Sequence, residues 1–426
     1  MNSLLEELTW RGLLYQHTEP LDAALTAGVV TGYCGFDPTA TSLHVGNLVP
    51  VMGLAHLQRA GHRPIVLIGG GTGMIGDPSG KTAERQLNTS ETVEKNSRAI
   101  QKQLERFLEF GEPRDAIMRD NAEWLLEMGA VDFMREVGKH FTVNYMMQKD
   151  SVRARMEEGG ISYTEFSYML LQAKDFLELN RRVGCTLQIG GSDQWGNITA
   201  GIELLRRVEG VEAHALTMPL VTTAAGTKFG KTEAGAVWLD PVLTSPYRFY
   251  QFWVNVDDRD ASRFLRFFTL MSREEIEALE LELAAHPERR VAQQALARDV
   301  TTRVHGVKAA KAAADVSALL FGRGEAAALS ADALEALREE VPFVSIPALP
   351  AEGIDATDLF VAAKLAASKG AAKRLLEQGG LSVNGGKLSA EQRIVRSEMM
   401  LAGGHLLLRK GARDYALVRV SAEAGD

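Results

Sequence analysis

Short apolar runs alternate with helical patterns along this chain, and that alternation restricts the possible fold more than any other feature. Near the start, the pattern predicts a strand at 29–36, a helix at 46–60 and a buried strand at 64–68. This order predicts a right-handed βαβ unit and a parallel sheet. The alternation resumes with a helix at 163–179, a strand at 186–189, a helix at 194–208 and a strand at 215–221. We therefore expect a Rossmann-type, doubly wound α/β sheet that binds ligands outside the carboxyl ends of its strands.

The rest of the chain follows other patterns. Strand signals stop near residue 246, and Ala/Leu/Glu-rich helical patterns continue to about residue 320. The proline-rich segment "VPFVSIPALPAEG" indicates a linker, and the later "LSVNGGKL" carries an Asn-Gly hairpin signal. We expect a Rossmann-type domain at 1–245, an all-helical domain at 246–340, a linker at 341–353 and a small α+β domain at 354–426.

Composition excludes several classes of protein. The sequence contains no run of 18 apolar residues, so no membrane span is expected. The acidic start of the chain does not resemble a signal peptide. The two cysteines are typical of a reducing compartment, so a cytoplasmic protein is expected. The nine histidines show no metal-ligand spacing, and no protein-held metal is expected. The net charge is −8, but residues 357–426 carry 11 Lys/Arg against 7 Asp/Glu, so a basic tail follows an acidic body.

The segment "PTATSLHVGN" (38–47) lies between the first predicted strand and its helix. A helix N-terminus there offers unpaired amides to a phosphate, which His44 could also contact, and Gly46 would let a base approach. The alternative is that Ser42 caps the helix and His44 is an ordinary surface residue.

Two further loops could bind phosphates. "GGGTGMIGDPSGK" (69–81) follows a strand but has Ile75 where a P-loop needs its first glycine, so we do not assign a P-loop. It still brings Asp77 and Lys81 to the sheet edge, unless it is an ordinary Gly-rich turn. "TKFGKT" (227–232) places two lysines three residues apart, and its alternative is a solvated basic turn.

The helix at 163–179 carries a polar stripe. Spacings of four and three put Tyr168, Gln172 and Asp175 on one face, among apolar neighbours. A buried carboxylate needs partners, which a ligand's ammonium or hydroxyl could supply. Hydrogen bonds to neighbouring strands are the alternative. "GGSDQWGN" (190–197) adds Asp193 and Gln194 after another strand.

Taken in order, these motifs resemble one family. "PTATSLHVGN" resembles the H-I-G-H signature of class I aminoacyl-tRNA synthetases, and "KFGKT" resembles their K-M-S-K-S loop. With "YCGFDPTATSLHVGN", "GDPSGK", "FSYMLLQAKD" and "GGSDQWGNI", the chain resembles the bacterial tyrosyl-tRNA synthetases from end to end. "AASKGAAKRLLEQGGLSVNGGKL" resembles an S-four-type RNA-binding domain. Asn47 replaces the second histidine of the signature, so its contact would lack a charge.

The resemblance implies a site for tyrosine and a site for ATP. Tyr33 and Asp175 would recognise the substrate hydroxyl, and the ammonium and carboxylate would meet Asp77, Tyr168, Gln172 and Gln194. Thr39 and His44 would stabilise charge on the phosphates. The nucleoside, its ribose and the turn around them would involve Cys34, Gly35, Asp37, Gly46, Asn47 and Asp193. The leaving pyrophosphate would contact Lys81, Arg85, Lys228, Lys231 and Thr232.

The implied reaction is activation of L-tyrosine by ATP with Mg²⁺, followed by transfer to tRNA, in a homodimer. Four cations of the tail are expected on its predicted helices: Lys364, Lys369, Lys373 and Arg374. The spacing of Lys369, Lys373 and Arg374 allows one basic face, and these cations are expected to contact tRNA phosphates. One alternative is a nucleotidyltransferase that uses no tRNA. The basic tail and the amino-acid pocket argue against it. The other is an RNA-binding or splicing factor derived from a synthetase, for which loss of His44 or Lys231 would have been a sign.

Overall fold

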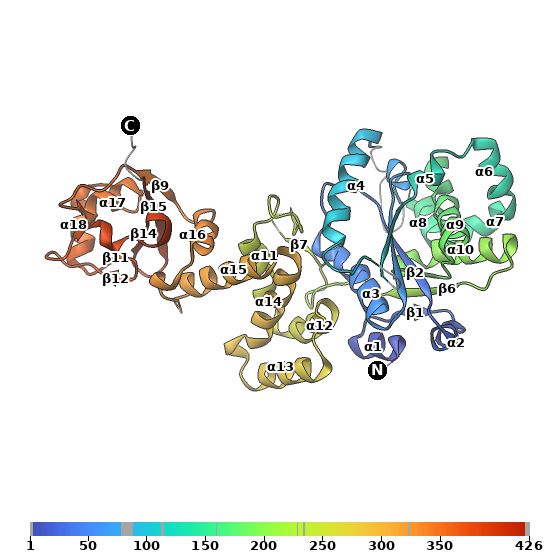
Figure 1. Cartoon of the computed structure of the whole chain (residues 1–426), viewed down its shortest axis with the longest axis horizontal. Helices are drawn as coiled ribbons and strands as arrows, with labels where there is room; N and C mark the ends of the chain where they lie inside the picture. The colour runs from blue at the N-terminus through green and yellow to red at the C-terminus, as the bar shows by residue number, and fades with distance from the viewer. Residues whose placement is uncertain are drawn as a thin grey trace. The chain divides into compact units, whose positions relative to one another are not determined.

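The computed structural model describes residues 3–77, 88–111, 115–158, 160–227, 229–232, 235–322 and 324–421. Its contacts divide the chain into two compact units, shown as ribbons in Figure 1. The first unit contains Met1–Asp240 and Val256–Ala292, and the second contains Pro241–Asn255 and Gln293–Asp426. The segment expected to be one helical domain, 246–340, is therefore shared between the two units. In the described part of the chain, no helix combines the length and the apolar character needed to cross a membrane.

The first unit is built on a sheet with the strand order β1-β6-β5-β2-β3-β4. Its parallel strands are β2 (Thr31–Phe36), β3 (Arg63–Ile68), β4 (Ile117–Asp120), β5 (Leu187–Gly191) and β6 (His214–Met218). The short β1 (Gln16–His17) pairs antiparallel with β6 at the edge. The chain runs outward from β2 in one direction and returns to β5 on its other side. The doubly wound sheet predicted from the sequence is confirmed, and its order reverses between β2 and β5.

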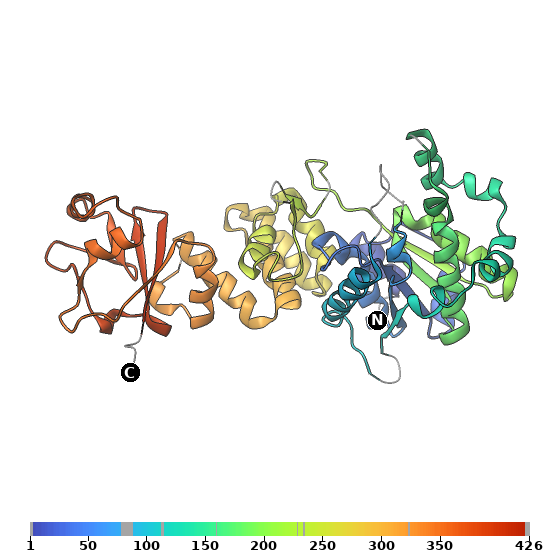
Figure 2. The same cartoon turned by 90° about the horizontal axis from the view of Figure 1, so that it is seen from above.

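Helices cover both faces of this sheet (Figures 1 and 2). On one face, α3 (Leu48–Arg59) packs on β2, β3 and β5, and nine of its residues are buried. On the other, α9 (Tyr163–Val183) packs against α10 (Trp195–Val208), which contacts β5 and β6. Ser162 caps the start of α9, and Gly184 ends it in the left-handed conformation. Other elements of this unit are α1 (Leu4–Arg11), α2 (Leu21–Ala27), α4 (Ser90–Leu104), α5 (Ala122–Leu125), α6 (Ala130–Glu136), α7 (Val143–Met147), α8 (Asp150–Glu158), β7 (Lys231–Thr232), β8 (Gly235–Ala236), α12 (Asp258–Phe268) and α13 (Arg273–Ala285).

The second unit joins helices to a small mixed sheet. The helices are α11 (Pro246–Val254), α14 (Val291–His305), α15 (Val307–Leu320), α16 (Ala331–Arg338), α17 (Ala356–Ala362) and α18 (Lys369–Glu377). The sheet has the order β12-β11-β14-β15-β9, with β9 (Phe343–Ile346), β11 (Leu381–Val383), β12 (Gly386–Lys387), β14 (His405–Lys410) and β15 (Asp414–Val420). A separate pair joins β10 (Ile354–Asp355) to β13 (Ile394–Val395). The predicted Asn-Gly hairpin is confirmed between β11 and β12, where Asn384 and Gly385 both have positive φ.

The prediction of a linker at 341–353 is wrong for residues 343–346. These residues form β9, which pairs parallel with β15 from Leu417↔Phe343 to Val420↔Ile346. Two prolines, Pro342 and Pro347, flank the strand. Prolines are tolerated there because β9 is an edge strand and has a partner on one side only. The segment is therefore part of the folded second unit.

Candidate functional site

Polar residues gather where the parallel strands of the first unit end. Asp37 follows β2, the glycine-rich turn 69–74 follows β3, and Asn121 follows β4. A Cβ on Gly69 would overlap the Asp37 carboxylate, and a Cβ on Gly70 would overlap the carboxylate of Asp120. The glycines of this turn are therefore required for the close approach of backbone to carboxylates.

Asp37 links the ends of β2 and β3 to helix α9. Its Oδ1 accepts a hydrogen bond from Thr72 Oγ1 (2.8 Å), and its Oδ2 accepts one from Tyr168 Oη on α9 (3.0 Å). Burial raises the pKa of Tyr168 well above its usual value, and the charge of Asp37 raises it further. Tyr168 is therefore a neutral hydrogen-bond donor in this site.

Tyr33 supplies a second buried phenol, close enough to Asp175 for the charge of that carboxylate to act on it. Tyr33 on β2 is 1% exposed, and within the described residues its Oη has no hydrogen-bond partner. Its ring packs edge-on against Phe176, with the centroids 5.2 Å apart. Burial, and then the charge of Asp175, raise the pKa of Tyr33 well above its usual value, so it stays protonated. A buried hydroxyl without a partner costs free energy, which a polar ligand group would recover.

Asp175 is held beside Tyr33 by two donors that the sequence reasoning missed. Trp124 Nε1 donates to Oδ1 (2.8 Å), and Asn121 Nδ2 donates to Oδ2 (2.9 Å). Burial raises the pKa of Asp175 to about 8, although both donors act to lower it. Gln188 is a further missed residue: it pairs in register with Tyr33, and its Oε1 is buried with no partner in the described structure.

A second group of hydrogen-bonded side chains joins an amide to a carboxylate after β3 and β5. Gln194 Nε2 donates to Asp77 Oδ2 (2.6 Å), and Asn197 Nδ2 donates to Gln194 Oε1 (3.2 Å). Gln172 is half-buried on α9, and the exposed Asp193 lies in the single turn before α10. The stripe predicted on α9 is thus partly bonded to the protein, through Tyr168 and Asp175, and faces the strand ends.

The segment around His44 forms a short turn that bonds to itself. His44 Nδ1 accepts from Gly46 N (3.0 Å), and Asn47 Oδ1 accepts from His44 N (3.0 Å). Because Nδ1 accepts, the proton of the neutral ring is on Nε2. A Cβ on Gly46 would lie 2.8 Å from His44 Cε1, so glycine is needed there. The alternative that Ser42 caps the helix is wrong, because Ser42 Oγ donates to Leu43 O and accepts from Asp240 N.

The second lysine-containing loop is anchored beside this turn. Val45 N donates to Val237 O (2.9 Å), and a Cβ on Gly230 would lie 2.8 Å from Val45 Cγ2. Phe229 packs against Phe264 and Phe268 of α12, with centroids 4.6 and 5.1 Å away. The backbone on either side of the loop therefore lies next to the His44 turn.

The remaining predicted residues on the ATP side are placed as follows. Thr39 and Gly35 are exposed, and Cys34 is buried with its pKa raised to about 12 by burial. Three predicted phosphate contacts, Lys81, Arg85 and Lys228, lie outside the described residues, and so do the side chains of Lys231 and Thr232. Within the described ranges, no group of three or more His, Cys, Asp or Glu side chains could hold a metal ion.

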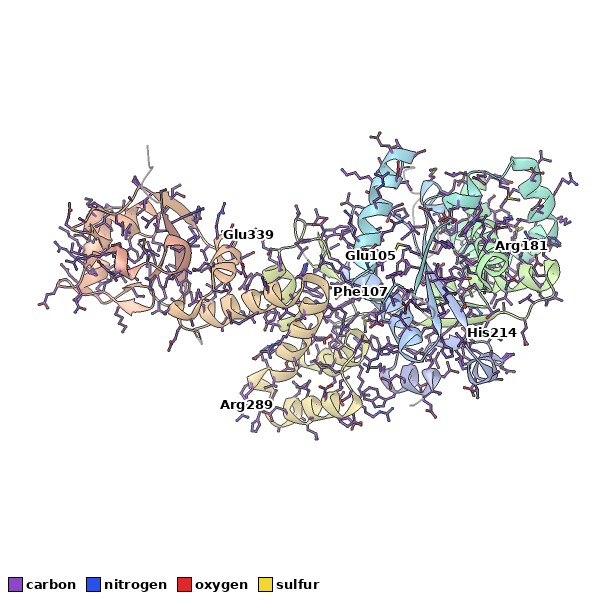
Figure 3. The ribbon with its side chains drawn as sticks, in the orientation of Figure 1. Glu105, Phe107, Arg181, His214, Arg289 and Glu339 are labelled. Carbon is purple, nitrogen blue, oxygen red and sulfur yellow. The ribbon has the colours of Figure 1, made fainter. Side chains whose placement is uncertain are left out.

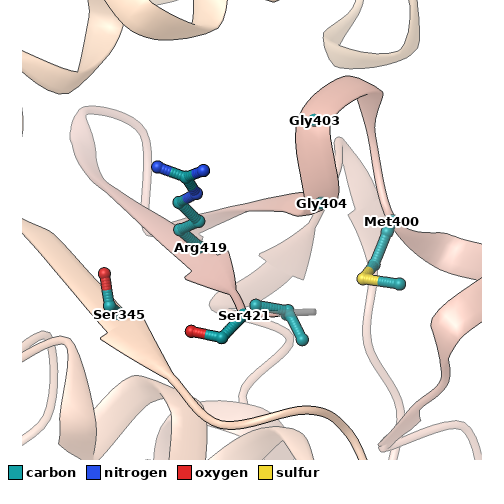
Figure 4. Close-up of a pocket in the computed structure, with 7 residues that line it drawn as sticks. Ser345, Met400, Gly403, Gly404, Arg419 and Ser421 are labelled. Carbon is teal, nitrogen blue, oxygen red and sulfur yellow. The ribbon is translucent and has the colours of Figure 1, made fainter. Parts of the chain in front are cut away.

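Basic residues occur on the small domain of the second unit. Lys369, Lys373 and Arg374 are exposed on α18, and Lys369 pairs with Asp358. The prediction that Lys364 is helical is wrong: it follows α17 with a φ of 59°. Two hollows also occur on this domain. One of about 480 Å³ is lined by residues that include Ser345 and Arg419 (Figure 4).

The second hollow, of about 390 Å³, is the more basic of the two. It is lined by Ser382, Lys387 and Arg409 together with glycines, and Arg409 Nε donates to Ser382 Oγ (3.2 Å). Neither hollow belongs to the unit that carries the cluster at the strand ends. They are therefore not parts of the cluster around Tyr33.

Known proteins with the same features identify the family. Residues 26–322 match the family model of class I tRNA synthetases (W and Y), and residues 333–418 match the SYY-like C-terminal domain of tyrosine–tRNA ligases. A tyrosine–tRNA ligase of Anaeromyxobacter dehalogenans is 54% identical over 420 residues, which cover 99% of this chain and 100% of that one. One of Roseiflexus castenholzii is 54% identical over 424 residues, with 99% and 100% covered.

A solved structure agrees with these matches. The C-terminally truncated mitochondrial tyrosyl-tRNA synthetase of Aspergillus nidulans superimposes with a TM-score of 0.69 at 30% identity, and the match covers 75% of this chain and 95% of that one. The parallel strands β2 to β6, the cluster around Tyr33 and the turn at His44 all lie within the part of the chain that matches the class I model. The chain therefore belongs to the tyrosyl-tRNA synthetases, class I ligases that use ATP to join tyrosine to tRNA.

Proposed function

We propose that the pocket around Tyr33 and Asp175 recognises the hydroxyl of the substrate tyrosine. The observation that carries this proposal is the buried Tyr33 Oη, which has no partner among the described residues, next to a carboxylate whose two oxygens are already oriented. The substrate phenol would accept from Tyr33 and donate to Asp175. Both groups would then be satisfied only when the substrate has a hydroxyl.

The other end of the pocket would hold the amino-acid backbone of the substrate. Asp77, Tyr168 and Gln172 would bind the ammonium, and Gln194 would orient the carboxylate. The hydrogen bond between Gln194 and Asp77 supports this assignment, because it places an acceptor and a donor within one ligand's reach. A tyrosine held at both ends would present its carboxylate toward the His44 turn for attack on the α-phosphorus of ATP.

The His44 turn would stabilise the phosphates of MgATP. His44 would donate from Nε2, together with Thr39, as charge develops on the phosphates. Cys34 and Asn47 would contact the ribose, since Asn47 uses Oδ1 within the turn and keeps its Nδ2 donors. The nucleoside and its surroundings would involve Gly35, Asp37, Gly46 and Asp193. The pyrophosphate would be held by Lys81, Arg85, Lys228, Lys231 and Thr232, and Mg²⁺ would enter as part of the nucleotide substrate.

The small domain of the second unit would bind tRNA in the transfer step. Exposed cations for RNA phosphates are provided by Lys369, Lys373 and Arg374 on α18 and by Lys364, which precedes the helix. Lys387 and Arg409 line the basic hollow of the same domain and would add to this contact. The α/β domain would then activate tyrosine, and residues 354–426 would bind RNA. Two buried, unpaired cysteines support a cytoplasmic location.

Exposed apolar side chains support a homodimer. Helices α6 to α8 and the start of α9 expose several of them: Val131, Met134, Val143, Met147, Met156 and Tyr163. Such a concentration is unusual on a monomer and indicates an interface.

Tyr163→Asp should therefore shift the protein to monomers in sedimentation. Leu281→Asp on α13 is a matched control, because Leu281 and Tyr163 are equally exposed, at 74%. A Tyr163→Asp protein that stayed dimeric would exclude this surface.

The hydroxyl proposal is tested by amino-acid-dependent ATP–pyrophosphate exchange across the twenty amino acids. Only tyrosine should support rapid exchange. Tyr33→Phe should lower kcat/KM for tyrosine by roughly tenfold, the value of one hydrogen bond, and leave the slow activation of phenylalanine unchanged. Tyr415→Phe removes another buried hydroxyl, bonded to Leu319 O in the second unit, and should change neither substrate. Equal losses with both amino acids in Tyr33→Phe would contradict the assignment.

A further inference from the structure

The indole of Trp124 is held from two directions. Its N–H donates to Asp175 Oδ1, and the guanidinium carbon of Arg182 lies 5.2 Å from the ring centroid. Arg182 follows Asp175 by seven residues on α9, which is about two turns, so both lie on the same side of the helix. One face of α9 therefore contacts both the edge and the face of the same indole ring.

Carboxylates fix the position of Arg182. Its Nε donates to Glu178 Oε2 (3.1 Å), and its Nη1 lies 3.7 Å from Glu123 Oε2. Glu178 is in turn bonded to the buried Lys174 Nζ (2.8 Å). A guanidinium fixed in this way loses less conformational entropy when it stacks on an aromatic ring than a freely rotating cation would.

The two donors to Asp175 differ in how the protein supports them. Asn121 is fixed by additional bonds, because its Oδ1 accepts from Gly71 N (2.8 Å) and its Nδ2 also donates to Thr72 Oγ1 (2.9 Å). The Trp124 side chain has a single N–H group, and Asp175 accepts its hydrogen bond. Trp124 itself belongs to the four-residue helix α5. The orientation of the indole must therefore come from contacts with its ring.

We propose that Arg182 is a positioning residue for recognition of the tyrosine hydroxyl: by stacking on Trp124 it keeps the indole N–H directed at Asp175. This inference rests on the proposed role of Asp175. Arg182 would not touch the substrate. Its effect would appear only for substrates that use the Asp175 carboxylate, so it should favour tyrosine over phenylalanine.

The test compares Arg182→Gln with Arg181→Gln. Arg181, labelled in Figure 3, is the neighbouring residue on α9. Its side chain is 40% exposed against 42% for Arg182, and both pair with Glu178. Arg181 pairs also with Glu209, whereas the cation found over the Trp124 ring in the described structure is Arg182. The two substitutions thus remove the same charge from the same helix, and only one removes the stacking on the indole.

Pyrophosphate exchange should be measured with tyrosine and with phenylalanine for both variants. Arg182→Gln should lower kcat/KM for tyrosine roughly three- to tenfold, as expected for loss of one cation–π contact, and leave that for phenylalanine unchanged. Arg181→Gln should change either value by less than about twofold. Arg182→Lys keeps the charge without the planar group and should recover part of the loss for tyrosine.

Two results would overturn the inference: equal losses with tyrosine and phenylalanine in Arg182→Gln, or the same tyrosine-specific loss in Arg181→Gln. Tyr33→Phe, assayed in parallel, separates this inference from the proposed function. If Tyr33→Phe impairs tyrosine activation selectively and Arg182→Gln does not, only the role of Arg182 is wrong. If neither variant is selective, the hydroxyl site itself is misplaced.

Discussion

The cluster around Asp175, proposed to bind the tyrosine hydroxyl, and the His44 turn are built in opposite ways. Asp175 is oriented by side chains from elsewhere in the chain, and its bonds to Asn121 and Trp124 span more than 50 residues. His44 is oriented by its own neighbours, Gly46 and Asn47, within three residues. The first arrangement is buried and depends on the whole fold. The second is local and half-exposed, which suits donors that must meet a large, highly charged ligand.

This difference suggests how the two regions contribute. A buried, pre-oriented pair of hydrogen-bonding groups discriminates between substrates, because an analogue without the hydroxyl leaves both groups unpaired. A histidine N–H held next to the phosphates would stabilise charge in the transition state. Substitutions in the first region should therefore change which amino acid is used, and substitutions in the second should change how fast it reacts.

The largest expected effect is discrimination against phenylalanine. Tyrosyl-tRNA synthetases are themselves the standard example of such a site, with a ratio of about 10⁵ in kcat/KM, so this magnitude is taken from the family and not from the structure. Pyrophosphate exchange with the two amino acids measures the ratio. A ratio below about 100 would show that the pocket around Tyr33 and Asp175 does not recognise the hydroxyl.

A smaller effect should appear in the pH dependence of tyrosine binding. Burial raises the pKa of Asp175 to about 8, the Asn121 and Trp124 donors oppose the shift, and Asp37 and Asp120 add to it. A substrate hydroxyl that donates to the carboxylate favours its ionised form, so binding should release a proton. Affinity for tyrosine should therefore rise about tenfold or more between pH 6 and pH 8.

Equilibrium dialysis of tyrosine without ATP measures this change, and calorimetry in two buffers measures the released proton. Asp175→Asn cannot titrate and should bind tyrosine weakly at every pH. The same shift affects folding: because the native pKa is raised, the contribution of Asp175 to stability is full below about pH 4 and is lost as the pH rises to about 8. A flat binding profile for the unmodified protein would mean that the hydroxyl does not meet Asp175.

The smallest effect is expected on the basic tail. Replacing Lys373 and Arg374 together with glutamine should weaken tRNA binding by roughly tenfold and reduce the slope of log K against log salt by about 1 to 2. Tyrosine-dependent pyrophosphate exchange should not change, because both residues belong to the second unit. A matched control is replacement of the exposed Lys308 and Lys311 on α15 of the same unit. Equal weakening of tRNA binding by both double variants would argue against a specific role for α18.

The sequence predicted the elements with strong periodicity and missed the weak ones. The strands and helices from β2 to β3 and from α9 to β6 were predicted because their apolar runs are long and their boundaries carry glycine or capping signals. β4, with only four half-buried residues, was missed, and with it Asn121, which follows the strand, and Trp124 in the short helix α5. The two donors to Asp175 leave no local pattern in the sequence, because Asn121 lies 54 residues and Trp124 lies 51 residues before it.

The same limit explains β9. Its four residues lie between prolines, which usually mark a linker, and only pairing with β15 makes them a strand. A truncation between residues 344 and 353, which the linker prediction would suggest, would remove β15 and leave all or part of β9 on the shortened chain without its partner strand. A cut intended to separate tRNA binding from activation should instead lie before Pro342.

The division of roles between the two regions is tested most directly by single-turnover tyrosine activation in Tyr33→Phe and His44→Ala. The account predicts that Tyr33→Phe weakens the tyrosine Kd by roughly tenfold with a smaller change in the rate constant. It predicts that His44→Ala lowers the rate constant by about 10²- to 10³-fold with the tyrosine Kd unchanged within about twofold. A His44→Ala protein that lost tyrosine affinity and rate equally, or that activated tyrosine at the normal rate, would contradict it.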